Sequence, residues 1–204
     1  SFTEGTEATI STWNHYALVR DGTGTNNIKL YRNGVVSAQQ TYTGDVGNST
    51  TALKLFGGDG NTYNETYVTD MRIVKGTAVY TNTFTPNTEP LTAISGTTFF
   101  VSANQPHFDD MSSNRLIASD GYSNTSVIET VPFSPYDKVP YDSASHGGSI
   151  FLGPGDQSFL TCSMSNIGTG NFTAEGWVYY DNMNSNHTFF SGDASNYNFD
   201  VYWQ

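Results

Sequence analysis

The sequence is short of charged residues and holds a single cysteine. Charged side chains make up 13% of the 204 residues, and 8 basic against 19 acidic residues give a formal net charge of −11. Such a chain repels a phosphate backbone and an anionic bilayer surface, so we expect no nucleic-acid partner. Cys162 has no second thiol for an internal disulfide, so stability must come from the core or from oligomerisation.

Long apolar runs are missing as well. No stretch approaches the about 18 consecutive apolar residues of a membrane span. The first residues, SFTEGTEATI, have neither the basic start nor the apolar region of a signal peptide. We therefore expect a soluble chain without membrane insertion, whose natural N-terminus lies elsewhere.

The residues that are abundant favour an all-β protein. Thr, Tyr and Phe suit pleated, half-buried surfaces, and Gly, Asn and Asp supply turns. A helical chain would need more Ala, Leu, Glu and Lys. A length of 204 residues allows either one sandwich, since all-β domains commonly run to about 200–250 residues, or two small cores.

The first strands are predicted close to the start of the chain. Residues 13–20 alternate in β-prone types, DGTGTNN supplies a turn, and IKLYRNG begins the next strand. Asn33-Gly34 suits a type I′ turn, because both of its central residues need a positive φ. VVSAQQTY is then the returning strand of a three-stranded unit.

Further strands are predicted along the rest of the chain. They cover residues 51–58, 67–76, 97–103, 115–119, 125–133, 149–153, 158–164, 171–181, 187–193 and 197–204. In 67–76, simple alternation predicts that Val68, Asp70, Arg72 and Val74 share one face. Residues 77–91 are expected to be an extended connection and residues 104–114 a loop, while the linker composition lies at 134–148.

Five stretches carry a family resemblance. They are WNHYALVRDG, IKLYRNG, YVTDMRIVKGTAVYTNTFTP, HGGSIFLGPGDQSFLTCSM and GTGNFTAEGWVYY. Together they resemble the laminin-G-like or concanavalin-A-like jelly-roll domains, in the version repeated in tandem in tail-fibre and appendage proteins of bacteriophages, notably those of marine cyanobacteria. The resemblance implies an antiparallel jelly-roll β-sandwich of the concanavalin A-like lectin/glucanase type.

The order of these stretches implies an unusual division of the chain. Residues 1–135 resemble the C-terminal portion of one laminin-G-like sandwich, 136–142 a linker, and 143–204 the N-terminal portion of the next. Either the sequence is a window on a tandem array, or the two portions close one circularly permuted sandwich. Pairing of residues 172–180 with 67–75 of the same chain would favour the second arrangement.

The acidic and histidine residues do not form a catalytic pattern. Glycoside hydrolysis needs two carboxylates across the scissile bond, which the glucanase relatives carry close together on one strand. The six glutamates are Glu4, Glu7, Glu65, Glu89, Glu129 and Glu175. None has an acidic neighbour at that spacing in an aromatic strand, and no Gly-x-Ser-x-Gly elbow accompanies the four histidines. We expect no enzyme, with His15 a structural histidine.

Two loop clusters are candidates for ligand binding. The resemblance implies calcium on rim loops, for which Asp109, Asp110 and Asn114 offer hard oxygen ligands, although Asx-turns explain the same residues. A sugar site needs an exposed aromatic ring beside amides and carboxylates. That combination occurs in the loop with Asp59, Asn61, Tyr63 and Asn64, which also offers oxygen ligands for calcium, and less completely around Tyr122 with Asp120 and Asn124. The strand aromatics Trp177, Tyr179, Phe189 and Phe190 are expected in the core.

The predicted function is that of a non-enzymatic module. The resemblance implies a structural and adhesion role in a phage virion appendage or another extracellular fibre, on a virion or at a cell surface. Its partners would be neighbouring copies or tandem domains of the same protein and a host cell-surface glycan, bound multivalently. The alternatives are an architectural spacer or capsid-decoration protein without ligand, and a bacterial secreted or surface adhesin.

Overall fold

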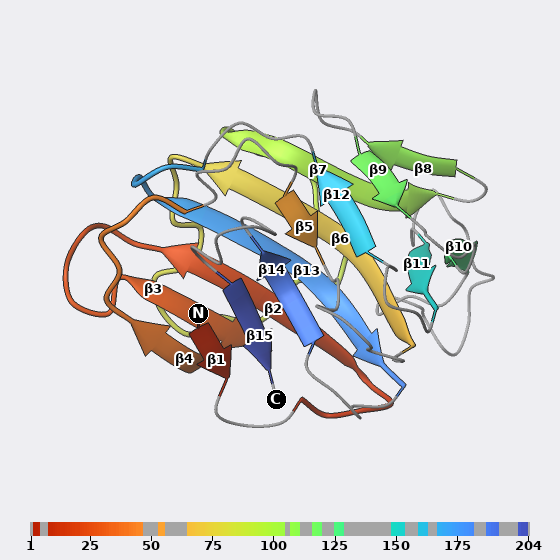
Figure 1. Ribbon diagram of the computed structural model, residues 1–204, viewed down its shortest axis with the longest axis horizontal. Helices are drawn as coiled ribbons and strands as arrows, with labels where there is room; N and C mark the ends of the chain where they lie inside the picture. The colour runs from red at the N-terminus through yellow and green to blue at the C-terminus, as the bar shows by residue number, and fades with distance from the viewer. Residues whose placement is uncertain are drawn as a thin grey trace.

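Two facing β-sheets form the protein. The computed structural model describes residues 2–4, 8–46, 53–55, 65–104, 107–110, 116–119, 125–128, 148–153, 159–162, 167–181, 187–191 and 200–203. These residues contain strands and irregular segments but no helix, and hence none long and apolar enough to cross a membrane. The all-β sandwich is as predicted (Figure 1).

Within the described residues, the larger sheet has nine strands. It contains β2 (Trp13–Arg20), β3 (Ile28–Arg32), β4 (Val35–Gln40), β6 (Thr66–Lys75), β7 (Thr97–Asn104), β8 (His107–Asp110), β10 (Thr125–Ile128), β11 (Ser149–Leu152) and β13 (Phe172–Tyr180). Its main order is β10-β11-β6-β13-β2-β3-β4, and β7 pairs with both β6 and β8. The predicted loop at 104–114 is therefore wrong in part, because its residues 107–110 form β8 against β7.

The smaller sheet, which lies in front of the larger one in Figure 1, has six short strands in the part of the chain that the structure describes. It contains β1 (Phe2–Glu4), β5 (Leu53–Leu55), β9 (Leu116–Ser119), β12 (Phe159–Cys162), β14 (His187–Ser191) and β15 (Asp200–Trp203), in the order β1-β15-β14-β5-β12-β9. β1 and β15 run parallel, and the other pairs of described strands are antiparallel.

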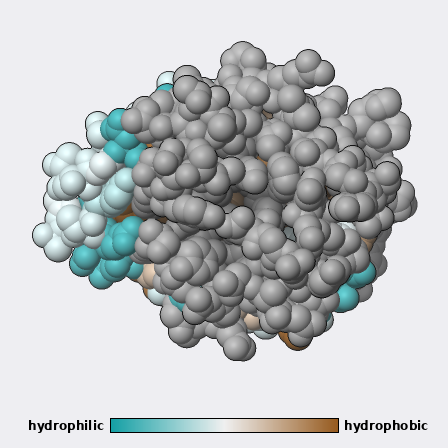
Figure 2. Space-filling view, in the orientation of Figure 1, coloured by the Kyte–Doolittle hydropathy of each residue, from teal (hydrophilic) through white to brown (hydrophobic). Residues whose placement is uncertain are grey.

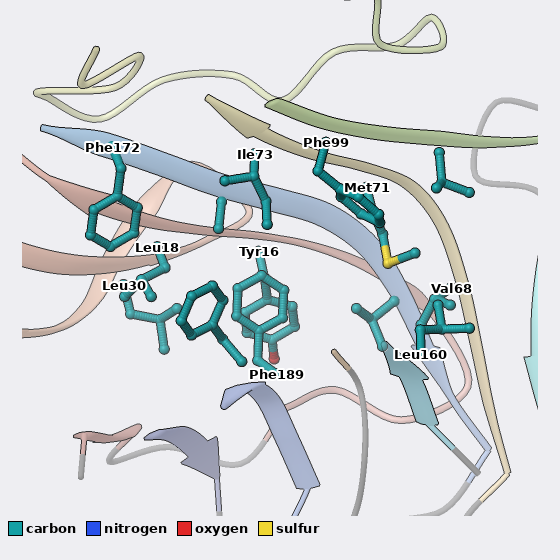
Figure 3. Packing of buried hydrophobic residues seen from close by; sticks show 14 of the residues in the cluster. Tyr16, Leu18, Leu30, Val68, Met71, Ile73, Phe99, Leu160, Phe172 and Phe189 are labelled. Atoms are coloured by element: carbon teal, nitrogen blue, oxygen red, sulfur yellow. The ribbon is translucent and has the colours of Figure 1, made fainter. Parts of the chain in front are cut away.

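The main core lies between the two sheets. Alternate residues of the larger sheet, such as Tyr16 and Leu18 on β2, point toward the smaller sheet and are fully buried. They meet Leu160 of β12 and the aromatic ring of Phe189 on β14 (Figure 3). Phe190 of β14 belongs to the same buried cluster. We call this side of the larger sheet its inner face and the opposite side its outer face.

Strand β13 occupies the centre of the larger sheet. It pairs along its length with β2 on one side and with β6 on the other. Residues 172–180 thus pair with 67–75 of the same chain, which is the pairing that favours one closed, permuted sandwich over a window on an array. The domain boundaries at 135 and 143 stay a prediction, and the linker at 136–142 lies outside the described residues.

A β-bulge interrupts β6 where it faces β13. Thr69 pairs with Trp177 and Arg72 with Glu175, so Asp70 and Met71 together oppose Gly176. Asp70 takes the left-handed conformation, with φ of 50°. The simple alternation predicted for 67–76 is therefore wrong beyond residue 70, because the extra residue moves Arg72 and Val74 to the face of Tyr67 and Thr69.

Residues 77–92, which we call the covering segment, cross part of the outer face. Val79 N donates to Thr173 Oγ1 at 2.8 Å, and Phe84 N donates to Gly34 O at 3.0 Å. Ala78, Tyr80 and Phe84 pack on a second, smaller apolar cluster of Ala17, Val19 and Tyr31. The extended connection predicted for 77–91 is confirmed, and the part of the outer face around Ala17, Val19 and Tyr31 is buried beneath it.

The Asn33-Gly34 turn fits the covering segment closely. Asn33 and Gly34 have φ of 50° and 79°, as a type I′ turn requires. A Cβ atom on Gly34 would lie 1.7 Å from the carbonyl oxygen of Phe84. Glycine is thus needed here for the turn and for the close approach of the covering segment.

The split chain tests the closed sandwich. When residues 1–135 and 143–204 are co-expressed as separate chains with different affinity tags, we expect them to co-purify, because β13 completes the sheet between β2 and β6. Analytical ultracentrifugation should give one complex of each portion. Two portions that purify apart, each folded and monomeric, would contradict the closed arrangement.

Two glycine variants test the attachment of the covering segment. Gly34→Ala should lower the free energy of unfolding by at least about 2 kcal/mol more than Gly22→Ala does. Both substitutions add a side chain at a positive φ, but only the Cβ added at Gly34 also collides with Phe84. Gly22 has open space around its Cβ position, so its substitution should cost about 1 kcal/mol. Urea unfolding measures both, and equal losses would contradict the close contact.

Candidate functional site

The outer face of the larger sheet gathers polar and aromatic side chains in successive rows across the strands. β13 supplies Thr173, Glu175, Trp177 and Tyr179 to this face, while Phe172, Ala174, Val178 and Tyr180 belong to the core. The covering segment lies over the rows that contain Thr173 and Glu175. The outer face therefore has a covered half with charged groups and a more open half with aromatic ones.

A buried carboxylate cluster lies in the covered half. The Glu175 side chain is fully buried, and Arg72 donates to its Oε1 from Nε at 2.9 Å and from Nη2 at 2.5 Å. The Tyr80 hydroxyl donates to Oε2 at 2.7 Å, and His15 Nε2 lies 3.3 Å from the same oxygen. Arg72 Nη1 also donates to Thr92 O at 2.6 Å. The cluster ties β13, β6 and β2 to both ends of the covering segment.

These contacts set the ionisation of the cluster. Burial by itself raises the pKa of Glu175, but the contact with His15, the charge of Arg72 and the hydrogen bond from Tyr80 outweigh it and hold that pKa below its usual range. Burial and the nearby Glu175 raise the pKa of Tyr80, so its hydroxyl remains a donor. Glu175 is therefore an ionised acceptor held by a guanidinium and a hydroxyl.

This arrangement suits a structural role better than acid catalysis. The proton donor of a glycosidase needs a carboxyl with a raised pKa and access to the glycosidic oxygen. Glu175 has a lowered pKa, and both of its oxygens contact protein groups under the covering segment. Removing a partner from such a buried ion pair is strongly destabilising.

His15 packs among rings in the same cluster. It is fully buried, with Trp177, Phe84 and Tyr80 edge-on to its imidazole at centroid distances of 5.2, 5.6 and 6.2 Å. Tyr80 and Phe84 stack on one another at 3.6 Å. The expected structural histidine is thus packed against aromatic rings and a carboxylate.

A second buried carboxylate lies near the start of the chain. Glu4 of β1 has a fully buried side chain, and its Oε1 lies 3.3 Å from Arg32 Nη1. Burial raises the pKa of Glu4, and Arg32 only partly opposes this. Glu4 and Glu175 therefore respond to pH in opposite directions.

One end of the sandwich is polar. Arg20 is fully buried at the end of β2 and donates to the carbonyl oxygens of Tyr42 at 2.7 Å and Gly44 at 2.9 Å. The loops that it holds expose hydroxyls and amides, and Figure 2 shows hydrophilic colours at this left end of the molecule. Arg20 therefore stabilises these loops by donating hydrogen bonds to their backbone oxygens.

An aromatic row crosses the open half of the outer face. Trp13 of β2 is opposite Tyr179 of β13, Tyr179 is opposite Tyr67 of β6, and Tyr67 is opposite Phe151 of β11. Their ring centroids are 5.8, 5.5 and 5.0 Å apart in that order. All four side chains are partly exposed. We call Trp13, Tyr179, Tyr67 and Phe151 the aromatic row.

The strand aromatics do not all behave as predicted. Phe189 and Phe190 are buried in the core as expected. Trp177 and Tyr179 lie on the outer face and are partly exposed, so their assignment to the core is wrong. Their spacing in FTAEGWVYY, at every second residue after Glu175, was the available signal, because alternate residues of a strand share a face.

The loop candidates are mostly untested. Asp59, Asn61, Tyr63, Asn64 and Asn114 lie outside the described residues, as do Asp120, Tyr122 and Asn124. The backbone of Asp109 and Asp110 belongs to β8, which is a strand and not the predicted rim loop. In the described part of the chain, no group of three or more His, Cys, Asp or Glu side chains is placed to hold a metal ion.

Comparison with known proteins supports the fold. Residues 1–79 match the laminin G-type family model described as the concanavalin A-like lectin/glucanases superfamily. No curated protein and no solved structure gives a significant match. This match confirms the predicted resemblance to the laminin-G-like, concanavalin-A-like class and the predicted fold class, and it covers the strands up to β6 and the first residues of the covering segment. The phage-appendage version of the family stays a prediction.

Neutralising Glu175 tests the buried carboxylate cluster. Glu175→Gln should lower the free energy of unfolding at neutral pH by about 3–5 kcal/mol, because Arg72 then lacks its buried counter-ion. Glu89 is exposed, and Glu89→Gln should change stability by less than about 0.5 kcal/mol. Urea unfolding at several pH values gives both quantities.

The pH dependence separates the two carboxylates. The lowered pKa of Glu175 gives stability that is present above the unfolded pKa near 4.5 and is lost as pH falls below it, so the deficit of Glu175→Gln should shrink toward pH 3. The raised pKa of Glu4 gives stability that is lost as pH rises above 4.5. The free energy of unfolding of Glu4→Gln should therefore increase relative to that of the wild type as pH rises through this range. A deficit of Glu175→Gln that does not vary with pH would contradict an ionised Glu175.

Proposed function

Since the chain carries a laminin G-type, concanavalin A-like sandwich, we propose that it is a non-enzymatic structural and adhesion module of an extracellular fibre, such as a phage virion appendage. Domains of this class serve as binding or structural modules, and a module repeated along a fibre gains avidity from weak individual contacts. The proposed location is therefore a virion or a cell surface, with neighbouring copies and a cell-surface glycan as partners.

The observation that carries the proposal is that one part of the outer face is covered by the chain itself, while another part presents partly exposed aromatic rings. Around Glu175 the face is occupied by the chain's own covering segment, whose Tyr80 donates to the carboxylate. An ionised, buried carboxylate with both oxygens engaged supports a structural use of this half. The open half offers aromatic rings at the surface, which suit adhesion.

Localisation and hydrolysis assays test the proposal. Gold-labelled antibodies against the chain, applied to virions and cells of its natural source, should label fibres or surfaces in electron micrographs. Incubation of the purified chain with polysaccharides should release no reducing ends above a heat-denatured control. Labelling confined to the cell interior would rule out the fibre module, and reducing ends released by the wild type but not by Glu175→Gln would identify an enzyme.

A further inference from the structure

We propose that the aromatic row binds a short, neutral oligosaccharide laid across strands β2, β13, β6 and β11. This deepens the proposed function by giving the adhesion module a ligand class and a place to bind it, and it rests on that proposal. The site differs from the loop of residues 59–64, which the sequence favoured.

The row is continuous because its members face one another in the strand register. Tyr179 has Trp13 on one side and Tyr67 on the other, and Tyr67 has Phe151 beyond it. Neighbouring strands lie about 4.8 Å apart, so the row spans about 14 Å from β2 to β11. That length fits several linked sugar rings better than a single one.

The rings lie on the side of the sheet that does not form the core. The sequence neighbours of Tyr179, namely Val178 and Tyr180, belong to the core between the sheets, and so do Ile150 and Leu152 beside Phe151. The ring contacts of Tyr80 and Phe84 in the covering segment are with His15 and Tyr31. The row thus continues the outer face beyond the part that this segment occupies, and its four side chains retain partial exposure.

Aromatic rings alone would equally suit a protein partner, and the charges beside the row favour a sugar. Asp181 directly follows β13 and is exposed, and its N–H donates to the carbonyl oxygen of Glu65, which directly precedes β6. Glu65 lies two residues before Tyr67 and Asp181 two residues after Tyr179. Burial raises the pKa of the Tyr67 hydroxyl, and the charges of Glu65 and Asp181 raise it further. Sugar hydroxyls donate to carboxylates, while rings pack on the apolar faces of pyranoses.

The sign of these charges also selects among glycans. Glu65 and Asp181 border the row in a chain of net charge −11. A uronate or sialate bound there would be placed near two carboxylates, at a cost in electrostatic repulsion. Neutral sugars carry no such cost, so neutrality is the expected property of the ligand.

A glycan array tests the proposal with the full 204-residue chain. The biotinylated chain, presented on streptavidin tetramers, is applied to immobilised neutral glucan, mannan, galactan and xylan tri- to hexasaccharides and to uronate- and sialate-containing glycans. We expect signals from one or more neutral series that increase with oligosaccharide length, and none from the acidic glycans. Absence of signal for every neutral glycan at high density would overturn the proposal.

Substitutions place the site. Tyr179→Leu and Trp13→Leu should each lower the array affinity by about tenfold or more, as expected for anchors at the centre of a contact, while Trp13→Phe should retain most of it. Tyr42→Leu removes a partly exposed ring at the polar end of the sandwich and should leave the affinity unchanged. Near-ultraviolet circular dichroism identifies the variants that fold. If Tyr179→Leu does not fold, the test rests on Trp13→Leu, which lies at the start of β2.

The charge rule has its own test. Asp181→Asn combined with Glu65→Gln should leave neutral binding within a few fold and admit uronate-containing glycans. If the Trp13→Leu, Tyr179→Leu double variant still binds glycans, the proposed site is wrong. If the wild-type chain self-associates and this double variant does not, the row is a contact between copies and the proposal is likewise overturned. Gold labelling is independent of these results, so the fibre module and the sugar site can fail separately.

Discussion

The rest of the structure depends on the insertion of β13 between β2 and β6. Phe172 through Tyr180 bring one set of side chains to the core and the alternate set to the outer face, so this strand builds both. Without it, the sides of β2 and β6 that face β13 would be unpaired edges, and each of these strands would have an apolar inner face beside such an edge. The Arg72–Glu175 ion pair lies at that junction, where it fixes β6 against β13 and accepts the covering segment through Tyr80.

The outer face divides into two halves with different physical characters. Under the covering segment, both carboxylate oxygens of Glu175 accept hydrogen bonds from the protein itself, and the cost of burying this charge is offset by Arg72 and Tyr80. In the aromatic row, the four residues keep partial contact with solvent. The first half stabilises the sheet, and the second is the surface proposed for recognition. One strand, β13, serves both because its outward residues change from Glu175 to Tyr179.

Local sequence signals predicted most of the strands and the Asn33-Gly34 turn, because alternation and turn chemistry are properties of adjacent residues, but they did not predict β1. The partners of Glu175 were not predictable, since Arg72, Tyr80 and His15 are brought together only by the pairing of distant strands. The assignment of Trp177 and Tyr179 to the core was wrong for a related reason. Alternation shows which residues share a face but not which face meets the second sheet. β8 was missed because a short strand can form from loop-like residues when a neighbour such as β7 supplies the pairing.

The bulge at Asp70 and Met71 has a consequence for comparing this chain with others. Up to Thr69 the odd-numbered residues of β6 face outward, and from Arg72 onward the even-numbered ones do. A relative that lacks the extra residue must be aligned with a one-residue gap at this point. An ungapped alignment would equate core positions on one side of the bulge with surface positions on the other. Substitution patterns along β6 are therefore interpretable only when the two segments of the strand are counted separately.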